Sequence, residues 1–298
     1  MKIYDCLQYL DEDVVLELRF NYLDKFVDKF VIVESKYTHS GKKRDLTFNI
    51  NRYPEFKKKI NYLVLDKEPS NLEIIKETDN EEKKNNILIL NPTKRELLQR
   101  ELLMNGIKEA SKDDLIMLSD VDEIPKLENL NLNDITEKFI FFKQKMFYYK
   151  FNLCSESIDW TGTKACKKKN LLSFQWLRNI KSKHYSTWRL DTLFNKKKYM
   201  GIHFIKDGGW HFSYIKTPEG IEEKLRSYAH HREYDLNPVG KKNIAQKIKN
   251  KESIYNLDID MRMSQSRFSK GQSLSVVELS HLPSYIKNNQ ARFKEWLA

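Results

Sequence analysis

The sequence predicts an α/β fold in which a mostly parallel central sheet is flanked by helices and is followed by an elaborated C-terminal half. Short apolar runs alternate with helical patterns through residues 1–118, which is typical of a parallel sheet covered on both faces. The 298 residues are 40% hydrophobic, enough to bury a substantial core. Because no linker rich in Pro, Gly or Ser interrupts the chain, we expect a single domain over residues 1–298.

Four strands are predicted in the first half. They are the apolar runs at residues 3–7, 30–33, 62–65 and 115–118. A helix is predicted over residues 14–23, where Leu16, Phe20 and Leu23 recur at helical spacing. Each apolar run is too short for a buried helix and is separated from the next by polar residues, as expected of strands.

A longer helix is predicted over residues 93–110. Thr93 is the expected N-cap, and Glu96 three residues later completes a capping box. The polar stretch 77–86 before it is expected to be a loop or a frayed helix.

The second half has a different pattern. Residues 139–153 are aromatic and β-prone, and residues 170–215 mix short strands with basic loops. Helices are predicted over residues 219–228 and 243–249, and an amphipathic helix over residues 284–297 closes the chain.

Composition excludes several classes of protein. Aromatic residues make up 12%, with 9 Gly and 7 Pro, so the chain is neither collagen-like nor disordered. No apolar run approaches the roughly 18 residues of a membrane span, and the N-terminus lacks the apolar region of a signal peptide. Three cysteines without a C-x-x-C pair suggest reduced thiols and a cytoplasmic location.

The positive charge is concentrated in the middle of the chain. The net charge is +11 overall, with −4 in residues 1–160, +10 in residues 161–200 and +5 in residues 201–298. Such a basic block suits a phosphorylated or lipid-linked acceptor, or peripheral contact with the cytoplasmic face of an anionic membrane. A solvated lysine-rich face is the alternative.

The strongest chemical signal is the run from Ser119 to Pro125 (SDVDEIP), which follows the apolar strand 115–118. Ligands of open α/β sheets bind at the carboxyl ends of strands. In an extended backbone Asp120 and Asp122 point the same way, so their oxygens could hold Mn²⁺ or Mg²⁺. An Asp-rich turn that caps the next element is the alternative interpretation.

Two mechanisms use such a motif. In one, the cation held by the two aspartates bridges the diphosphate of a nucleotide-sugar. In the other, Asp120 is a phosphoryl-accepting nucleophile and Asp122 its general acid, as in haloacid-dehalogenase-like phosphatases. The second mechanism usually places the motif on the first strand, whereas here it follows the fourth, so the first is favoured.

Several blocks of the sequence resemble glycosyltransferase family 17, and they occur in the family's order along nearly the whole chain. The matching blocks are residues 4–6, 16–19, 30–35, 38–41, 119–125, 208–214, 231–234 and 282–283. The family includes β-1,4-mannosyl-glycoprotein N-acetylglucosaminyltransferases. The lysines at 167–169 and 196–198 have no family counterpart, which leaves the acceptor open.

The resemblance implies a GT-A-like fold and an inverting transfer from a UDP-sugar, with UDP-N-acetylglucosamine the expected donor. It also implies that Asp120 and Asp122 are the family's Asp-x-Asp. The acceptor would be a glycan, a glycoprotein or a lipid-linked sugar. On this basis residues 1–125 are expected to bind the nucleotide-sugar and residues 126–298 the acceptor.

Four further residues are candidates for the donor site. Glu34 ends a buried strand and could accept hydrogen bonds from uracil or ribose, and Arg100 could reach a phosphate. Trp210 could stack on a sugar, and His211 could complete the metal shell. Each has a structural alternative: a solvated strand end, a surface salt bridge, core packing and a packed histidine. The preceding Gly208-Gly209 suggests a close backbone approach or a positive φ.

An inverting transfer also needs a general base for the acceptor hydroxyl. Asp207 and Glu233 are the two main candidates, and Asp191 is a third. A nucleotidyltransferase using Asp120 and Asp122 remains a rival enzyme. A nucleic-acid-binding protein is the rival from another class, but no known binding module is present, so no nucleic-acid partner is expected.

Overall fold

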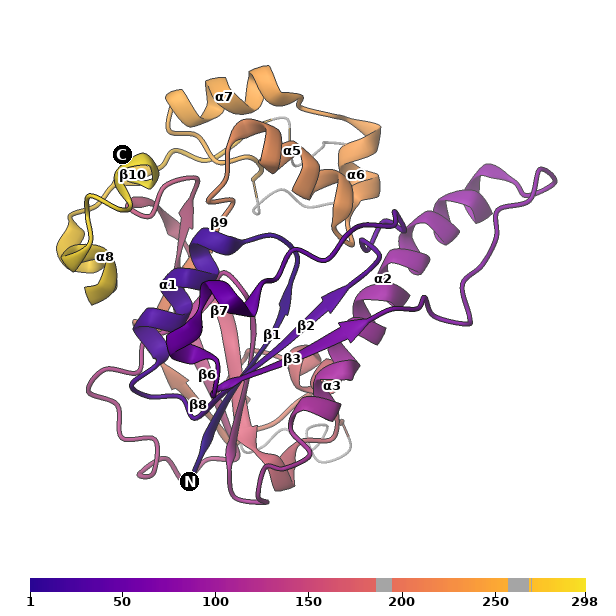
Figure 1. The fold of residues 1–298 in the computed structure, drawn as a ribbon. Helices are drawn as coiled ribbons and strands as arrows, with labels where there is room; N and C mark the ends of the chain where they lie inside the picture. The colour runs from indigo at the N-terminus through magenta and orange to yellow at the C-terminus, as the bar shows by residue number, and fades with distance from the viewer. Residues whose placement is uncertain (186–194, 257–267, 269) are drawn as a thin grey trace.

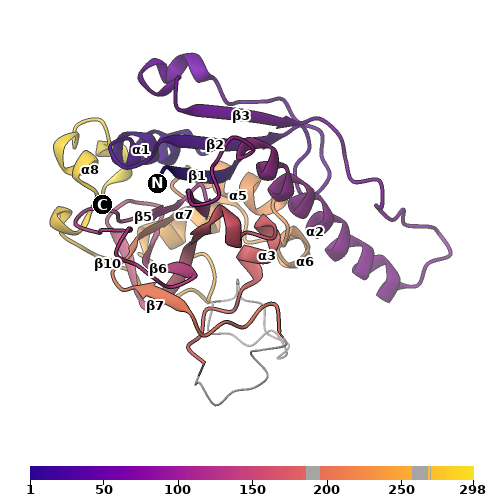
Figure 2. The same cartoon turned by 90° about the horizontal axis from the view of Figure 1, so that it is seen from below.

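The computed structural model describes residues 1–185, 195–256, 268 and 270–298. One sheet runs through the centre in the order β3-β2-β1-β4-β7-β6-β9-β5, with β8 also paired to β6 and β10 to β7. Helices cover this sheet on both sides (Figures 1 and 2). The predicted α/β class with helices flanking a central sheet is confirmed.

The first half forms the parallel part of the sheet. Its strands are β1 (Ile3–Tyr9), β2 (Lys29–Ser35), β3 (Ile60–Leu65) and β4 (Leu115–Asp120). All three pairings among them are parallel, so their carboxyl ends share one edge. Each predicted strand is present and extends by two or three residues. Helix α1 (Asp13–Leu23) agrees with the predicted helix to one residue.

Helix α2 (Glu81–Gly106) differs from the predicted helix at both ends. The polar stretch before Thr93 is helical rather than a loop, because Asn80 accepts a hydrogen bond from the Lys83 amide and caps the helix there. Thr93 is not an N-cap, since its hydroxyl donates to the Ile89 carbonyl one turn earlier. The first part of α2 projects from the body as an arm (Figure 1).

The second half adds mainly antiparallel pairings. The strands are β5 (Glu123–Pro125), β6 (Phe139–Tyr148), β7 (Leu153–Lys167), β8 (Ile202–Ile205), β9 (Gly209–Ser213) and β10 (Ser275–Val276). The β-prone stretch predicted over 139–153 is interrupted at Tyr149, which has a φ of 63° and starts the turn into β7. Strands β6 and β7 therefore form a hairpin.

The helices of the second half lie at several places around the sheet (Figure 1). They are α3 (Phe174–Asn179), α5 (Pro218–Ser227), α6 (His231–Leu236), α7 (Lys241–Lys249) and α8 (Ser284–Asn288), with 3-10 turns at Ile50–Arg52, Pro54–Phe56, Lys168–Asn170, Leu279–His281 and Lys294–Trp296. The predicted terminal helix is wrong in length: α8 stops at Asn288, and a 3-10 turn follows. Phe293 nevertheless reaches the core between them.

The hydrophobic core is shared by the two halves. One cluster joins Leu7 and Phe20 of the first half to Phe212, Ile286 and Phe293 of the second, and all five are fully or almost fully buried. Because the halves bury these side chains against each other, the parallel strands hold a fixed position relative to the loops of the second half.

Candidate active site

The turn between β4 and β5 carries Asp120 and Asp122, and a buried arginine holds it in place. Arg19 of α1 forms an ion pair with Asp5 at 2.6 Å, and both side chains are inaccessible to solvent. The same guanidinium donates hydrogen bonds to the carbonyls of Val121, at 3.2 Å, and Glu123, at 2.7 Å. The ion pair compensates the charge of the arginine, and the turn backbone takes up its remaining donors.

Asp122 lies next to a histidine and a lysine from the second half of the chain. The β5–β9 register pairs Glu123 with His211, which brings the His211 Nε2 to 3.5 Å from the Asp122 carboxylate. Lys224 of α5 donates to the other carboxylate oxygen at 3.2 Å. Burial alone would raise the pKa of Asp122, but Lys224 and His211 hold it well below its usual range. Asp122 is therefore ionised at neutral pH.

Lys224 joins this aspartate to the end of β1. Its ammonium also lies 3.2 Å from the Glu12 carboxylate, and Lys216 pairs with the neighbouring Asp11 at 2.6 Å. Burial would lower the pKa of Lys224, whereas Asp122 and Glu12 raise it, so the lysine stays charged. We call Asp11, Glu12, Asp120, Asp122 and Glu123 the acidic cluster.

Arg178 of α3 provides a second cation for this cluster. It donates to Asp120 at 2.7 Å and to Glu123 at 2.9 Å. The fully buried Glu123 also accepts a hydrogen bond from the Trp160 indole at 2.7 Å. Sequence reasoning missed Arg178, Lys224 and Trp160. The only signal for Arg178 was its place in the basic block, which does not distinguish it from its neighbours.

Arg100 of α2 lies behind Asp120. Its guanidinium donates to Glu96 and Gln175, both at 2.5 Å, and lies 3.9 Å from the Asp120 carboxylate. Its Nε atom is buried and has no hydrogen-bond partner. Arg100 therefore borders the site, and its hydrogen bonds are to protein groups; phosphate binding by Arg100 stays a prediction.

The whole chain, residues 1–298, matches the model of glycosyltransferase family 17. The chain belongs to this family. The β-1,4-mannosyl-glycoprotein 4-β-N-acetylglucosaminyltransferases of Homo sapiens and Rattus norvegicus are each 24% identical to it over 240 residues. These matches cover 76% of this chain but only 43% and 42% of the two relatives, so the chain spans less than half of their length.

Two solved structures also match this family 17 chain at low similarity. HddC from Yersinia pseudotuberculosis is 9% identical with a TM-score of 0.35, over 70% of this chain and 92% of HddC. A putative glucose-1-phosphate thymidylyltransferase from Bacillus anthracis is 11% identical with a TM-score of 0.34, over 70% of this chain and 88% of that protein.

Two predicted site residues of the family 17 chain have structural surroundings instead. Glu34 is fully buried, and its carboxylate accepts hydrogen bonds from Arg44 at 2.9 Å and Tyr62 at 2.7 Å. Trp210 belongs to the hydrophobic core, where its indole donates to the His281 carbonyl at 2.7 Å. Neither side chain faces the acidic cluster in the described contacts. Both side chains are buried in the structure. A residue's position at a strand end or after two glycines does not show in the sequence whether its side chain is buried.

The three candidates for the general base lie in different parts of the chain. Asp207 is exposed and pairs with Lys126 at 3.2 Å, near the end of β5 that points away from Asp122. Glu233 lies on α6, and one of its carboxylate oxygens is buried without a hydrogen-bond partner. Asp191 lies outside the described residues.

The side chains at Asp122 would fit a divalent cation whose remaining ligands come from a bound diphosphate. The pair supplies a carboxylate and an imidazole, and the His211 Nδ1 is buried without a partner. No group of three or more His, Cys, Asp or Glu close enough to hold a metal occurs among the described residues. A cation bound through one or two protein groups plus substrate phosphates does not need such a group.

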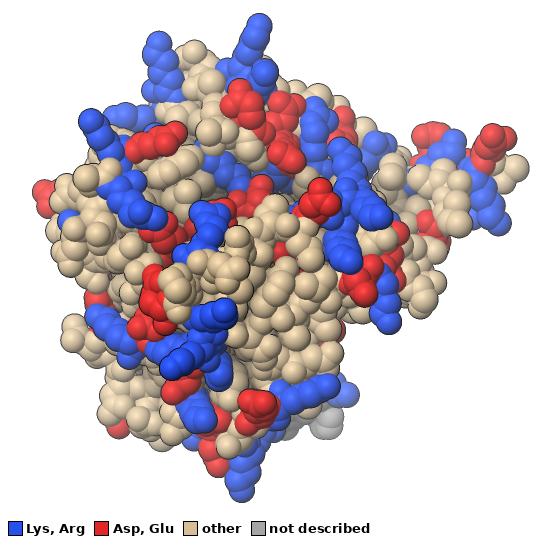
Figure 3. Space-filling view, viewed as in Figure 1, with Lys and Arg blue, Asp and Glu red and all other residues tan. Residues whose placement is uncertain are grey.

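Three global features complete the description. Among the described residues, no helix is both long and apolar enough to cross a membrane. Acidic and basic side chains alternate over the face seen in Figure 3, so that face has no broad area of a single charge. Cys6, Cys154 and Cys166 are all buried free thiols.

Proposed function

We propose that this family 17 chain transfers N-acetylglucosamine from a UDP-sugar to a glycan or glycoconjugate, with inversion at the anomeric carbon and with Mn²⁺ or Mg²⁺ bound. The observation that carries the proposal is the Asp122–His211 pair at the carboxyl edge of the parallel strands, with Lys224 beside it. The sugar and acceptor follow the names of the relatives, which transfer N-acetylglucosamine to β-1,4-mannosyl-glycoprotein.

The donor side of the reaction is assigned to the acidic cluster and its cations. Asp122 and His211 would hold the metal ion beside Asp120, and the ion would supply positive charge to the departing diphosphate. Lys224, which pairs with Glu12 and Asp122 at 3.2 Å each, would supply a further positive charge for the diphosphate. Arg178 fixes the Asp120 carboxylate through an ion pair at 2.7 Å.

For the acceptor side we assign Glu233 as the general base. One of its carboxylate oxygens is buried without a hydrogen-bond partner. This is expected of a base whose partner is a hydroxyl of the substrate. Asp207 is exposed and its carboxylate already has two protein partners, Lys126 at 3.2 Å and Lys145 at 3.8 Å. Glu233 would take the hydroxyl proton as that oxygen attacks the anomeric carbon. The bond from this carbon to the diphosphate oxygen then breaks, and its electron pair leaves with UDP.

The free thiols and the Arg178 ion pair bear on the cellular location and on the rival phosphatase function. A cytoplasmic location agrees with three free thiols, which reducing compartments preserve. A phosphatase that uses Asp120 as its nucleophile is disfavoured because Arg178 occupies that carboxylate at 2.7 Å.

The test combines metal-dependent nucleotide binding with product analysis. Thermal unfolding is measured with UDP, UDP-N-acetylglucosamine and ADP, each with and without Mn²⁺. We expect the uridine nucleotides to stabilise the protein only with Mn²⁺, and Asp122→Asn to abolish that shift. Equal shifts without metal, or none with any uridine nucleotide, would falsify the donor assignment.

The base assignment is tested with a matched pair of variants. Glu233→Gln is expected to retain the UDP shift and lose transfer, on the order of 100-fold for a general base. Asp207→Asn, which changes an equivalent carboxylate elsewhere, should retain both. The reverse pattern would assign the base to Asp207.

A further inference from the structure

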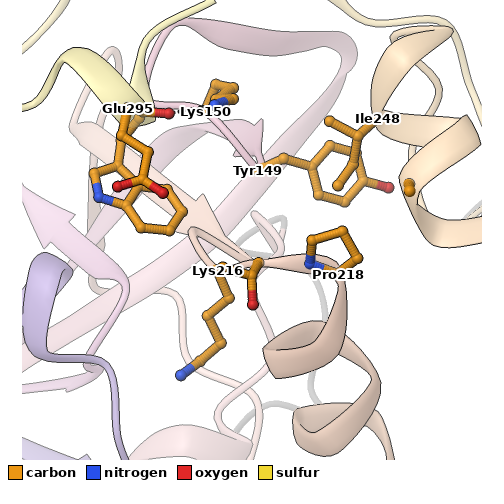
Figure 4. A pocket seen from close by; sticks show the side chains of 9 residues that line it. Tyr149, Lys150, Lys216, Pro218, Ile248 and Glu295 are labelled. Carbon is orange, nitrogen blue, oxygen red and sulfur yellow. Dashed lines mark hydrogen bonds between the residues drawn. The ribbon is translucent and has the colours of Figure 1, made fainter. Parts of the chain in front are cut away.

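A small open hollow of about 210 Å³ lies where the ends of β6 and β9 meet the C-terminal segment. Its walls come from distant parts of the chain: the β6–β7 turn, the first turn of α5, helix α7 and the 3-10 turn Lys294–Trp296. Figure 4 shows Tyr149, Ile248 and Pro218 on one side, with Lys150 and Glu295 across from them. The C-terminal wall is fixed by a hydrogen bond from the Phe151 amide to the Trp296 carbonyl at 2.8 Å.

The lining combines apolar surface with a polar rim. Tyr149, Pro218, Ala245, Ile248 and Trp296 supply the apolar surface. Lys150, Thr217 and the exposed Glu295 supply an ammonium, a hydroxyl and a carboxylate. A ring with one C–H face and hydroxyls around its edge matches this arrangement, because the face packs on the aromatic side chains and the hydroxyls meet the polar rim.

Two residues with strained backbone, Tyr149 and Tyr214, lie in the turns that lead into the hollow. Tyr149, at the end of β6, has a φ of 63°, and Tyr214, at the end of β9, has a φ of 56°. Bulky side chains rarely adopt this left-handed conformation, which costs on the order of 1 kcal/mol or more at each residue. The Tyr149 amide donates to the Ser213 carbonyl at 3.0 Å, so the two strained turns are joined. Strain of this kind is found mainly at ligand-binding sites.

The hollow is connected to the acidic cluster by one side chain and one helix. The Lys216 backbone borders the hollow, and its ammonium points away from the lining rings and pairs with Asp11 (Figure 4). Helix α5 starts in the hollow at Pro218 and reaches Lys224 six residues later, about 9 Å along its axis. Helix α5 thus links the hollow to Lys224, which pairs with Asp122 at 3.2 Å.

We propose that this hollow is an acceptor subsite that binds a sugar ring of the acceptor other than the one that reacts, an inference that rests on the proposed glycosyltransferase function. The size suits this role, since about 210 Å³ is below the range of about 300–1,000 Å³ typical of drug-sized ligands. The exposed Glu295 would hold two hydroxyls, and Trp296 would cover the apolar face of the ring.

The test is saturation-transfer NMR on the full chain, with methyl β-D-mannopyranoside and methyl β-D-N-acetylglucosaminide as probes. We expect saturation of the ring protons of at least one glycoside. Trp296→Ala and Glu295→Ala should each lower it at least threefold, while Trp176→Phe, which alters a tryptophan on α3, should leave it unchanged. Cyclohexanol, an apolar ring with a single hydroxyl, should show much less saturation than the glycosides.

The same samples separate the two proposals. If UDP with Mn²⁺ stabilises the protein but no glycoside is saturated, the subsite is wrong and the donor assignment stands. Equal saturation in wild type and in Glu295→Ala, an exposed position whose change should not prevent folding, would also overturn the subsite. So would saturation by cyclohexanol alone. If UDP fails to bind while the glycosides do, the donor assignment fails and the carbohydrate site remains.

Discussion

At the scale of single residues, Arg178 is expected to have a large effect on stability. It pairs with Asp120 and with the fully buried Glu123, so its removal leaves a buried carboxylate without its counter-ion. We expect Arg178→Leu to lower the free energy of unfolding by about 3 kcal/mol, measured by urea denaturation.

The control for this prediction is a double-mutant cycle. Glu123→Gln removes the charge that Arg178 compensates and retains most of the shape of the side chain. In the Glu123→Gln background, Arg178→Leu should therefore cost much less than in the wild type. Additive effects of the two substitutions would show that the ion pair does not account for the loss.

His39 provides a prediction on pH. Burial is the main cause that lowers its pKa from the ordinary value of about 6.5, against the opposing effects of Glu96 and of its hydrogen bond to Gln99 at 2.9 Å. The unfolded chain then binds a proton at this histidine at a higher pH than the folded chain does. The contribution of His39 to the free energy of unfolding is fully present above about pH 6.5. It is lost as the pH falls through the lowered pKa of the folded state.

We expect His39→Asn to remove part of the acid sensitivity between pH 6.5 and 5. Urea denaturation of both proteins at pH 8, 7, 6 and 5 measures this difference. If the two stability curves stay parallel across that range, His39 does not titrate as described.

Residue chemistry was predictable only where it was encoded locally. The Asp-x-Asp run was found because an apolar strand precedes it, and His211 because it follows two glycines. Lys224 and Arg178 are brought to the same place by α5 and α3, which lie 102 and 55 to 58 residues farther along the chain. No local pattern marks a lysine or arginine that acts through such a long-range contact.

At the scale of elements, α2 shows why a correct local signal can mark the wrong boundary. Pro92 followed by Thr93 and Glu96 has the pattern of a helix start, but a proline is also tolerated inside a helix that other contacts hold. The arm before it is capped by Asn80 and braced by Asn91, which donates to the Glu73 carbonyl at 2.7 Å. Residues after Arg100 pack on the sheet, whereas Ile89 and Leu90 are about half exposed.

We expect amide hydrogen exchange to be faster in residues 83–92 than in residues 97–106 of the same helix. Asn80→Ala should accelerate exchange in the first segment further, since an N-cap contributes about 1 kcal/mol, without changing the global unfolding midpoint. A lower midpoint in that variant would mean that the arm unfolds together with the body.

The turn before β9 allows a matched glycine comparison. Gly209 has a φ of 125°, and a Cβ added there would lie 2.2 Å from the Ile124 carbonyl oxygen. Gly240 has a φ of 77°, but a Cβ there would meet nothing within 4 Å. The close approach predicted for Gly208-Gly209 is thus present and lets β9 pair with β5.

Gly209→Ala should cost about 3 kcal/mol or more and weaken UDP binding, because it displaces the strand that carries His211. Gly240→Ala should cost about 1 kcal/mol, from its φ alone, and leave binding intact. Thermal unfolding with and without UDP and Mn²⁺ measures both effects. Similar losses in the two variants would contradict the role of the contact with Ile124.

At the scale of the whole molecule, the parallel strands and helices α5 and α7 were predictable, whereas the order of the remaining strands was not. The four parallel strands are continuous apolar runs, which a sequence shows directly. The strands β5 to β9 are short, irregular or bulged, and their order depends on pairings between distant segments, such as β9 beside both β6 and β5. The division at residue 125 into donor and acceptor halves remains a prediction.

The fold determines how far the basic block (residues 161–200) lies from the acidic cluster. Because β7 runs antiparallel to β4, Lys167 pairs with Leu115, at the end of β4 opposite to Asp120. The separation along the strand is about 17 Å, roughly twice the Debye length at physiological salt. Lysines 167–169 therefore lie too far away to hold a phosphate at the acidic cluster. Lys169 pairs with Asp113 at 2.6 Å, and contact with an anionic surface and a solvated face are the two roles left for this part of the block.

The last prediction separates these two roles. Lys167→Gln combined with Lys169→Gln should leave the affinity for UDP with Mn²⁺ unchanged within about twofold, because screening removes the field of these charges over that distance. Binding to phosphatidylserine vesicles in a sedimentation assay should weaken, by about 1 kcal/mol for each lysine that lies at the surface, and the difference should disappear at high salt. A tenfold loss of UDP affinity would place the block beside the nucleotide after all, whereas unchanged vesicle binding would leave these lysines as a solvated face.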